Sequence, residues 1–273
     1  MKDVKIKKLA LFAAAGNLPL LALREAARQG IPCITVAFYN ISEFDKLAQF
    51  RDIPLYKTQI AYFKHILRIL QKEKVDSILM AGKIEKVNLF KVIKFDLTTL
   101  RLFLKLKDRS DASLLQGVTD FYESHGIRFV SQKDFFQGYI TPKGFLTRSR
   151  CSSRVLEDLK WGFQTARHLA DLNIGQSLLA GHKVIVSVEG IEGTDRMILR
   201  SRDLLLKENY FLKAAKRSQN PKYDLPVFGL TTLKLLEQMK IRFIGLEAGM
   251  VLIPEQKEVI EYADRKKMVI YGI

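Results

Sequence analysis

The stretch Val188 to Asp195 gathers acids, glycines and a hydroxyl directly after the apolar run Val184 to Val186. Its polar side chains belong to Glu189, Glu192, Thr194 and Asp195. The apolar run predicts a buried strand, and ligands of α/β proteins tend to bind beyond the carboxyl ends of strands. Glycines let a backbone approach a ligand closely, and grouped carboxylates suit a hard cation such as Mg²⁺. The spacing therefore indicates either a metal or ligand site or, equally, an acidic surface turn.

A second concentration of polar residues extends from Lys213 to Pro226 and contains one acid, Asp224. Four cations precede that acid, namely Lys213, Lys216, Arg217 and Lys222. Lys and Arg side chains offset the charge of phosphates, so the stretch predicts a diphosphate clamp. A carboxylate among cations stays ionised, which suits Asp224 to binding a metal or polarising water. The alternative is a basic surface loop in which Asp224 only pairs with a lysine.

Other motifs narrow the chemistry. Gly16 and Asn17 follow the first apolar run, but this stretch lacks the Gly-x-Gly-x-x-Gly pattern of dinucleotide sites. A helix that begins there could still bind phosphate at its N-terminus. The four histidines are scattered without metal-ligand spacing, so zinc chemistry is not expected. Glu247 to Gly249 lies between two predicted strands and is either a turn or another ligand contact.

The elements that must position these residues alternate regularly in the first half. Strands are predicted over 8–14, 34–38, 77–81 and 127–130, and helices over 18–29, 59–72 and 111–125. This alternation predicts a Rossmann-like domain with a parallel, doubly wound sheet over residues 1–137. Residues 83–109 interleave basic and apolar side chains, which indicates a packed helix with a solvated lysine face or a basic helix on a membrane surface.

In the second half, helices are predicted over 154–172, 233–240 and 255–265, and strands over 178–180, 183–188, 242–245 and 250–253. They predict a mixed α/β catalytic domain over 154–273, with residues 138–153 as an interdomain linker rich in Gly, Pro, Ser and Thr. The pattern leaves the strand order open. Thr194 or Asp195 is expected to cap the helix after the acidic turn, a role that competes with catalysis.

The overall composition is that of a folded chain with anionic partners. Of 273 residues, 48% are hydrophobic, and the net charge is +16. Such a charge favours nucleic acid, an anionic membrane or phosphate-bearing substrates, but the basic residues are spread out and no nucleic-acid motif is present. The two cysteines, Cys33 and Cys151, form neither a disulfide framework nor a metal motif, which suggests a reducing cytoplasm.

Taken together, several segments resemble the LpxI-type UDP-2,3-diacylglucosamine pyrophosphatases of lipid A synthesis. They include 9–19, 80–83, 111–115, 123–126, 158–162, 174–176, 188–195, 219–229 and 247–249. The resemblance implies a homodimer that requires Mg²⁺. It also implies that the protein hydrolyses UDP-2,3-diacylglucosamine to UMP and 2,3-diacylglucosamine 1-phosphate (lipid X), and that water attacks the sugar-side phosphorus. It also implies a cytoplasmic protein peripheral to the inner face of the inner membrane, and no nucleic-acid partner.

The resemblance also assigns roles to residues. It implies Asp224, Glu192 and Asp195 as catalytic residues, and Asp224 and Glu189 as metal ligands. Together with the motifs above, we predict the following substrate-binding residues: Gly16, Asn17, Lys83, Gln176, Thr194, Lys213, Lys216, Gln219, Lys222, Glu247 and Gly249. The family pattern is usually glycine-rich where this chain has Ala14 and Ala15, and it has Lys-Pro where this chain has Lys216-Arg217. These departures leave open a non-catalytic homologue that binds a nucleotide-sugar or an anionic lipid.

Overall fold

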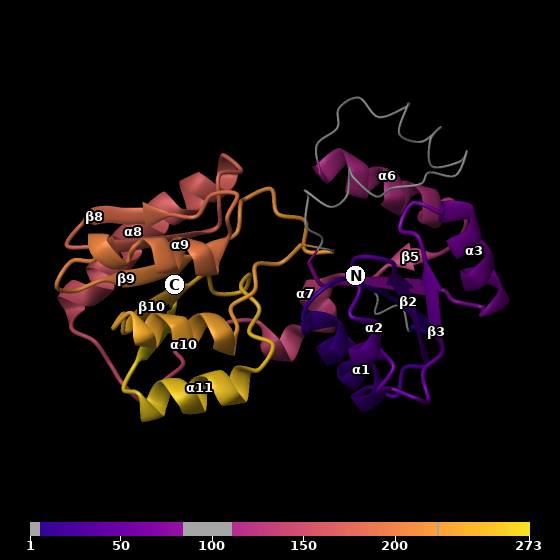
Figure 1. The fold of residues 1–273 in the computed structure, drawn as a ribbon, viewed down its shortest axis with the longest axis horizontal. Helices are drawn as coiled ribbons and strands as arrows, with labels where there is room; N and C mark the ends of the chain where they lie inside the picture. The colour runs from indigo at the N-terminus through magenta and orange to yellow at the C-terminus, as the bar shows by residue number, and fades with distance from the viewer. Residues whose placement is uncertain (1–5, 84–110, 223) are drawn as a thin grey trace. The chain divides into compact units, whose positions relative to one another are not determined.

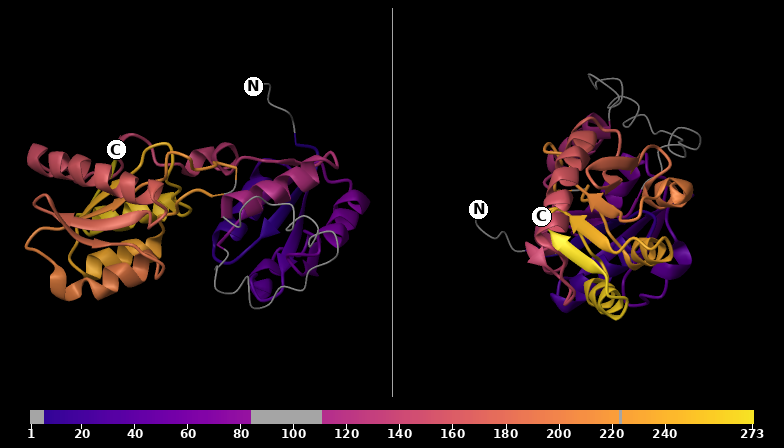
Figure 2. Two further views of the ribbon diagram at one scale, coloured as in Figure 1. Left: turned by 90° about the horizontal axis from the view of Figure 1, so that it is seen from above. Right: turned by 90° about the vertical axis from the view of Figure 1, so that its left-hand side faces the viewer.

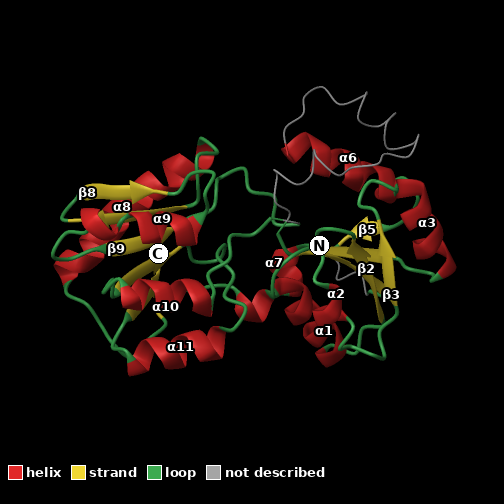
Figure 3. Ribbon diagram, viewed as in Figure 1, coloured by secondary structure: helices red, strands yellow, loops and turns green. Residues whose placement is uncertain are grey.

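The computed structural model describes residues 6–83, 111–222 and 224–273 (Figure 1). Apart from Lys83, the predicted basic helix within 83–109 therefore lies outside the described residues. The chain divides into two compact units, Met1–Phe135 and Phe136–Ile273. Both units are α/β, as the sequence predicts (Figure 3).

The first unit is built on a parallel sheet of five strands in the order β3-β2-β1-β4-β5. The strands are β1 (Leu9–Ala13), β2 (Cys33–Phe38), β3 (Leu55–Thr58), β4 (Ser77–Ala81) and β5 (Arg128–Phe129). This arrangement confirms the predicted Rossmann-like sheet. β3 was not predicted, because its partly exposed Leu-Tyr-Lys-Thr sequence carries neither an apolar run nor a clear alternation.

Helices cover both faces of this sheet. They are α1 (Leu18–Arg28), the short α2 (Phe44–Leu47), α3 (Phe63–Lys72), α6 (Asp111–Glu123) and α7 (Gln132–Phe135). Ile66 and Leu70 of α3 and Tyr122 of α6 pack with Ala10 and Phe12 of β1. Because side chains alternate along a strand, Leu9 and Leu11 point to the opposite face, and α1 lies against β1 and β4. The predicted helix at 59–72 begins at Phe63.

The second unit contains a mixed sheet of six strands in the order β6-β11-β10-β9-β7-β8. The strands are β6 (Gly144–Phe145), β7 (Ser177–Gly181), β8 (Val184–Val188), β9 (Tyr210–Lys213), β10 (Phe243–Leu246) and β11 (Val269–Gly272). The stretch 138–153, which we expected to link the domains, lies in this unit, because β6 pairs antiparallel with β11. The predicted strand at 250–253 forms only isolated bridges through Leu252, to Ile140 and Val227.

The second sheet is sandwiched between helices (Figure 2). They are α8 (Ser153–Asp171), α9 (Thr194–Arg200), α10 (Leu230–Gln238) and α11 (Gln256–Arg265), with one-turn 3-10 helices η1 (Gln137–Tyr139) and η2 (Arg202–Leu204). α8 packs on one face with Leu178, Tyr210 and Leu212. α9, α10 and α11 pack on the other face with Leu179 and Phe211. Lys213 follows Phe211 by two residues, so strand alternation directs it toward the α9 face.

Within the described parts of the chain, none of the helices combines the length and the apolar character needed to cross a bilayer.

Candidate active site

The predicted site residues of the second unit converge on one edge of its sheet. β9 and β10 are parallel, and β8 runs in the same direction because both β8 and β9 are antiparallel to β7. The carboxyl ends of these strands therefore meet at one edge, which brings together Glu189, Lys213 and Glu247. Ser177 begins β7 at the same edge, since β7 runs in the opposite direction. The acidic stretch and the basic stretch, far apart in sequence, meet here.

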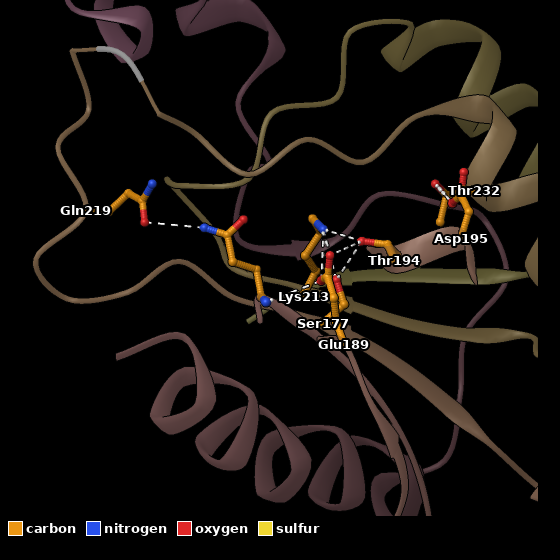
Figure 4. Close-up of polar contacts among 8 residues, drawn as sticks. Ser177, Glu189, Thr194, Asp195, Lys213, Gln219 and Thr232 are labelled. Atoms are coloured by element: carbon orange, nitrogen blue, oxygen red, sulfur yellow. Dashed lines mark hydrogen bonds and ion pairs between the residues drawn. The ribbon is translucent and has the colours of Figure 1, made fainter. Parts of the chain in front are cut away.

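Lys213 lies at the centre of a buried polar network (Figure 4). Its Nζ donates to Ser177 Oγ at 2.9 Å and to Thr194 Oγ1 at 3.0 Å. The same Nζ lies 4.0 Å from Glu189 Oε2, and Thr194 Oγ1 donates to Glu189 Oε1 at 3.0 Å. Lys213 is 5% exposed and Ser177 is 1% exposed, so water hardly screens these charges. We call Ser177, Glu189, Thr194 and Lys213 the lysine network.

A line of hydrogen bonds joins this network to Asp224. The backbone N–H of Gln176 donates to Glu189 Oε2 at 3.3 Å. The Gln176 side-chain amide donates to Gln219 Oε1 at 3.4 Å, and Gln219 Nε2 donates to Asp224 Oδ2 at 2.6 Å and to the Asp224 carbonyl. Gln219 is buried, whereas Asp224 is exposed. The predicted residues Gln176 and Gln219 thus contact the acids of the site directly.

The other two acids of the acidic stretch make separate contacts. Glu192 Oε1 accepts from Arg200 Nε at 3.0 Å and Nη2 at 2.8 Å. Backbone hydrogen bonding at Glu192, followed by the Arg200 guanidinium, lowers the pKa of this carboxyl. Asp195 Oδ1 accepts from Thr232 Oγ1 at 2.8 Å, which ties α9 to α10 (Figure 4). In the structure these two acids hold the turn and its helix in place.

The expected capping of α9 by Thr194 or Asp195 is wrong. Gly193, with φ of 86°, occupies the N-cap position, and Thr194 is the first residue of the helix. A positive φ is readily adopted by glycine, which explains the second glycine of the acidic stretch. The Thr194 hydroxyl contacts the lysine network, and the Asp195 carboxylate contacts α10.

Glu247 supports the loop that follows β9. Its Oε2 accepts from the Ala215 backbone N–H at 2.7 Å, and its Oε1 accepts from Arg167 Nη2 at 2.8 Å. Gly249, with φ of 75°, donates its N–H to the Thr141 carbonyl. Both positions, predicted to bind substrate, therefore have structural contacts in this unit.

The cations of the predicted diphosphate clamp contact different groups of the protein. Lys213 points into the lysine network, Lys216 Nζ donates to Asn173 Oδ1 at 3.2 Å, and Arg217 Nη1 pairs with Asp171 at 3.0 Å. The backbone N–H of Lys222 donates to Asn220 Oδ1 at 3.0 Å. Lys216 and Arg217 thereby fasten the loop after β9 to the turn after α8 and to the last residue of α8.

In the first unit, the structure brings together Gly16, Asn17 and Lys83. Gly16 and Asn17 follow β1, Lys83 follows β4, and Ala15 and Lys83 exchange backbone hydrogen bonds of 2.9 and 3.2 Å. The chain leaves β1 toward β2 on one side and returns to β4 on the other, so this edge is a topological switch point, where open α/β sheets bind ligands. Asn17 is the N-cap residue of α1, whose first turn carries no acid.

Some residues outside the motifs above also contact the predicted site residues. They are Ser177, Thr232, Arg167 and Arg200. Ser177 directly follows the Ile-Gly-Gln segment, which is a usable signal. Thr232 and the two arginines lie on helices, in sequence contexts that carry no comparable signal.

The carboxylates of the described residues do not form a preformed metal cage, because no group of three or more His, Cys, Asp or Glu among them is arranged to hold an ion. Mg²⁺ is commonly bound by one or two carboxylates together with substrate phosphates, so a full protein cage is not required. Asp224 is exposed and fits that requirement.

This is a two-unit α/β protein with a switch-point edge in one unit and a polar network at the strand ends of the other. The sequence models of the LpxI N-terminal domain and the LpxI C-terminal domain match residues 8–139 and 142–271. The chain therefore belongs to the LpxI family. A curated relative, UDP-2,3-diacylglucosamine pyrophosphatase LpxI of Caulobacter vibrioides, is 25% identical over 281 residues that cover 98% of each chain.

Similarity to solved structures is weak. The biotin carboxylase domain of Hydrogenobacter thermophilus 2-oxoglutarate carboxylase is 15% identical with a TM-score of 0.27, over 73% of this chain and 41% of that one. Acinetobacter baumannii MurG is 12% identical with a TM-score of 0.30, over 95% and 82%. Neither similarity carries an argument about this protein.

Proposed function

We propose that this chain hydrolyses the diphosphate of UDP-2,3-diacylglucosamine to UMP and 2,3-diacylglucosamine 1-phosphate. The observation that carries the proposal is the convergence of the acidic and basic stretches at one sheet edge, in a chain that aligns end to end with a pyrophosphatase. Water would add to the sugar-side phosphorus, and the bond from that phosphorus to the bridging oxygen would break. UMP would leave with that oxygen.

Asp224 is the residue best placed for the chemical step. It is exposed, and Gln219 fixes its carboxylate by a 2.6 Å hydrogen bond. We propose that Asp224 holds Mg²⁺ or orients the attacking water. When bound, Mg²⁺ would offset the charge that develops on the phosphoryl oxygens. Glu192 and Asp195 stay predictions as catalytic residues, and their contacts to Arg200 and Thr232 favour roles in holding the acidic stretch.

We propose that the switch-point edge of the first unit contributes to binding the nucleotide. The N-terminus of α1 lies beside Gly16 and Asn17, and helix N-termini favour phosphate, although Pro19 supplies no N–H and the Leu20 N–H donates to the Asn17 carbonyl. Lys83, exposed on the neighbouring loop, adds a positive charge. Lys216 and Lys222 remain predicted phosphate contacts of the second unit.

The lipid nature of this substrate, together with the net charge of +16, supports a cytoplasmic protein that works peripherally on the inner face of the inner membrane. A homodimer remains part of the proposal.

The test is hydrolysis in water labelled with ¹⁸O. We expect label in 2,3-diacylglucosamine 1-phosphate and none in UMP, because the added oxygen stays on the attacked phosphorus. Label in UMP would place the attack on the other phosphorus. Tight substrate binding without UMP release would instead identify a non-catalytic homologue.

A further inference from the structure

We infer that Lys213 is a positioning residue that holds Glu189 and Thr194, and that Glu189 consequently is not a ligand of Mg²⁺. The sequence pattern predicted a diphosphate clamp for Lys213 and a metal ligand for Glu189. The contacts of the lysine network give both residues a different task. The part of this inference that concerns UMP release rests on the proposed function.

The Lys213 ammonium is committed to groups of the protein. An ammonium has three N–H donors and accepts no hydrogen bond. Ser177 Oγ and Thr194 Oγ1 accept at 2.9 and 3.0 Å, and Glu189 Oε2 supplies the opposite charge at 4.0 Å. A lysine that is 5% exposed has lost most of its hydration, so it depends on these partners. A diphosphate would have to compete with all of them.

Glu189 is equally committed. Its Oε1 accepts from Thr194 at 3.0 Å, its Oε2 accepts from the Gln176 N–H at 3.3 Å, and its side chain is 14% exposed. A divalent cation on this carboxylate would lie close to the Lys213 ammonium, and like charges repel strongly where water is excluded. Lys213 therefore already supplies the positive charge that Glu189 needs.

The consequence for the reaction passes through Gln176 and Gln219. Glu189 accepts from the Gln176 backbone, Gln176 donates to Gln219, and Gln219 donates to Asp224. If Lys213 no longer held Glu189, the start of β7 would shift, and Asp224 would lose its fixed orientation. Lys213 thus acts on Asp224 through three intervening residues, without contacting substrate.

The first experiment is a double-variant cycle in urea unfolding with EDTA present, which needs no activity. Lys213→Met and Glu189→Gln each leave a buried charge without its opposite charge, so each should lower the folding equilibrium constant by about tenfold or more. In the double variant, the folding equilibrium constant should fall by a much smaller factor than the product of the two single-variant factors. Independent effects would overturn the pairing. If Lys213→Met does not fold, folding of the double variant supports the pairing, and its failure to fold contradicts it.

The second experiment measures UMP release by full-length variants. Lys213→Arg should recover part of the kcat lost in Lys213→Met, while KM stays within about twofold of wild type, because no ground-state contact with substrate is lost. A KM increase of about tenfold with unchanged kcat would instead identify a diphosphate clamp. Lys257→Met, an exposed lysine on α11, is the matched control and should change neither value.

The inference that Glu189 is not a ligand of Mg²⁺ is tested in the Glu189→Gln variant. The Mg²⁺ concentration for half-maximal UMP release should stay within about twofold of wild type, and a rise of about tenfold would show that Glu189 is a ligand. Electron paramagnetic resonance of added Mn²⁺ gives the same comparison without turnover. If the wild type releases no UMP, the proposed function fails, whereas the unfolding cycle still decides whether Lys213 holds Glu189.

Discussion

Gly175 is the position at which a single methyl group should disturb the site most directly. A Cβ built on Gly175 would lie 2.1 Å from the Glu189 carbonyl oxygen, 2.7 Å from the carbonyl carbon and 2.9 Å from the Glu189 Cβ. Two of these atoms are backbone, so a rotamer change cannot relieve the overlap. The turn after α8 must move away from Glu189 by about 1 Å, and overpacking of this kind typically costs about 1–3 kcal/mol.

The same displacement should impair catalysis as well as stability. Gln176 follows Gly175 and connects Glu189 to Gln219, so the movement reaches the group that orients Asp224. A misplacement of about 1 Å can cost on the order of 100-fold in rate. We therefore expect Gly175→Ala to lower kcat for UMP release by about 100-fold, while urea unfolding shows a loss of only about 1–3 kcal/mol.

Gly138→Ala is the matched control, because a Cβ at Gly138 meets no atom of the described residues within 4 Å. It should leave kcat unchanged and the unfolding free energy within about 0.5 kcal/mol of wild type. Full activity of Gly175→Ala would mean that the contact between Gly175 and Glu189 does not position the site.

Three further predictions concern single side chains. Thr194→Val removes an acceptor of Lys213 and a donor to Glu189, so it should cost about 1–3 kcal/mol in urea unfolding, whereas Thr194→Ser should cost little. The pKa of Glu192 is lowered in the folded state, so its carboxylate stabilises the fold above the unfolded pKa, and this stabilisation is lost as the pH falls through the folded pKa. The unfolding free energies of wild type and Glu192→Gln should therefore differ by at most about 1 kcal/mol at neutral pH and should become equal in acid. Burial raises the pKa of the Cys33 thiol to about 12. In the Cys151→Ser variant Cys33 is the remaining cysteine, and it should react slowly with a thiol reagent at pH 8 in the native protein and quickly once the protein is unfolded. Rapid reaction of the native variant would contradict this burial.

Strand periodicity was enough to predict four of the five strands of the first sheet but only three of the six strands of the second. β1, β2 and β4 are buried, continuous apolar runs, which is the pattern of a parallel sheet covered by helices. In the second sheet, β9 and β11 were missed, because Tyr210–Lys213 ends in a lysine beside the basic stretch and Val269–Gly272 follows a run of charged residues. The lysine that obscures β9 is the one that the site buries.

The components of the site were recognisable from sequence, but their pairing was not. The acidic stretch and Lys213 were both candidates for the site, whereas their direct contact depends on the strand order, in which β7 lies between β8 and β9. Residue type and spacing do not determine that order. Similarly, the role of Gly193 as the N-cap of α9 depends on its φ of 86°, which releases Thr194 for the lysine network.

The proposal that Asp224 serves Mg²⁺-dependent hydrolysis at this sheet edge is decided by UMP release from UDP-2,3-diacylglucosamine. Wild type should release UMP with Mg²⁺ and lose the activity in EDTA. Asp224→Asn should be slower by about 100-fold or more at saturating Mg²⁺, while the exposed control Asp203→Asn should retain the wild-type rate. Full turnover by Asp224→Asn, or equal rates with Mg²⁺ and with EDTA, would contradict the claim.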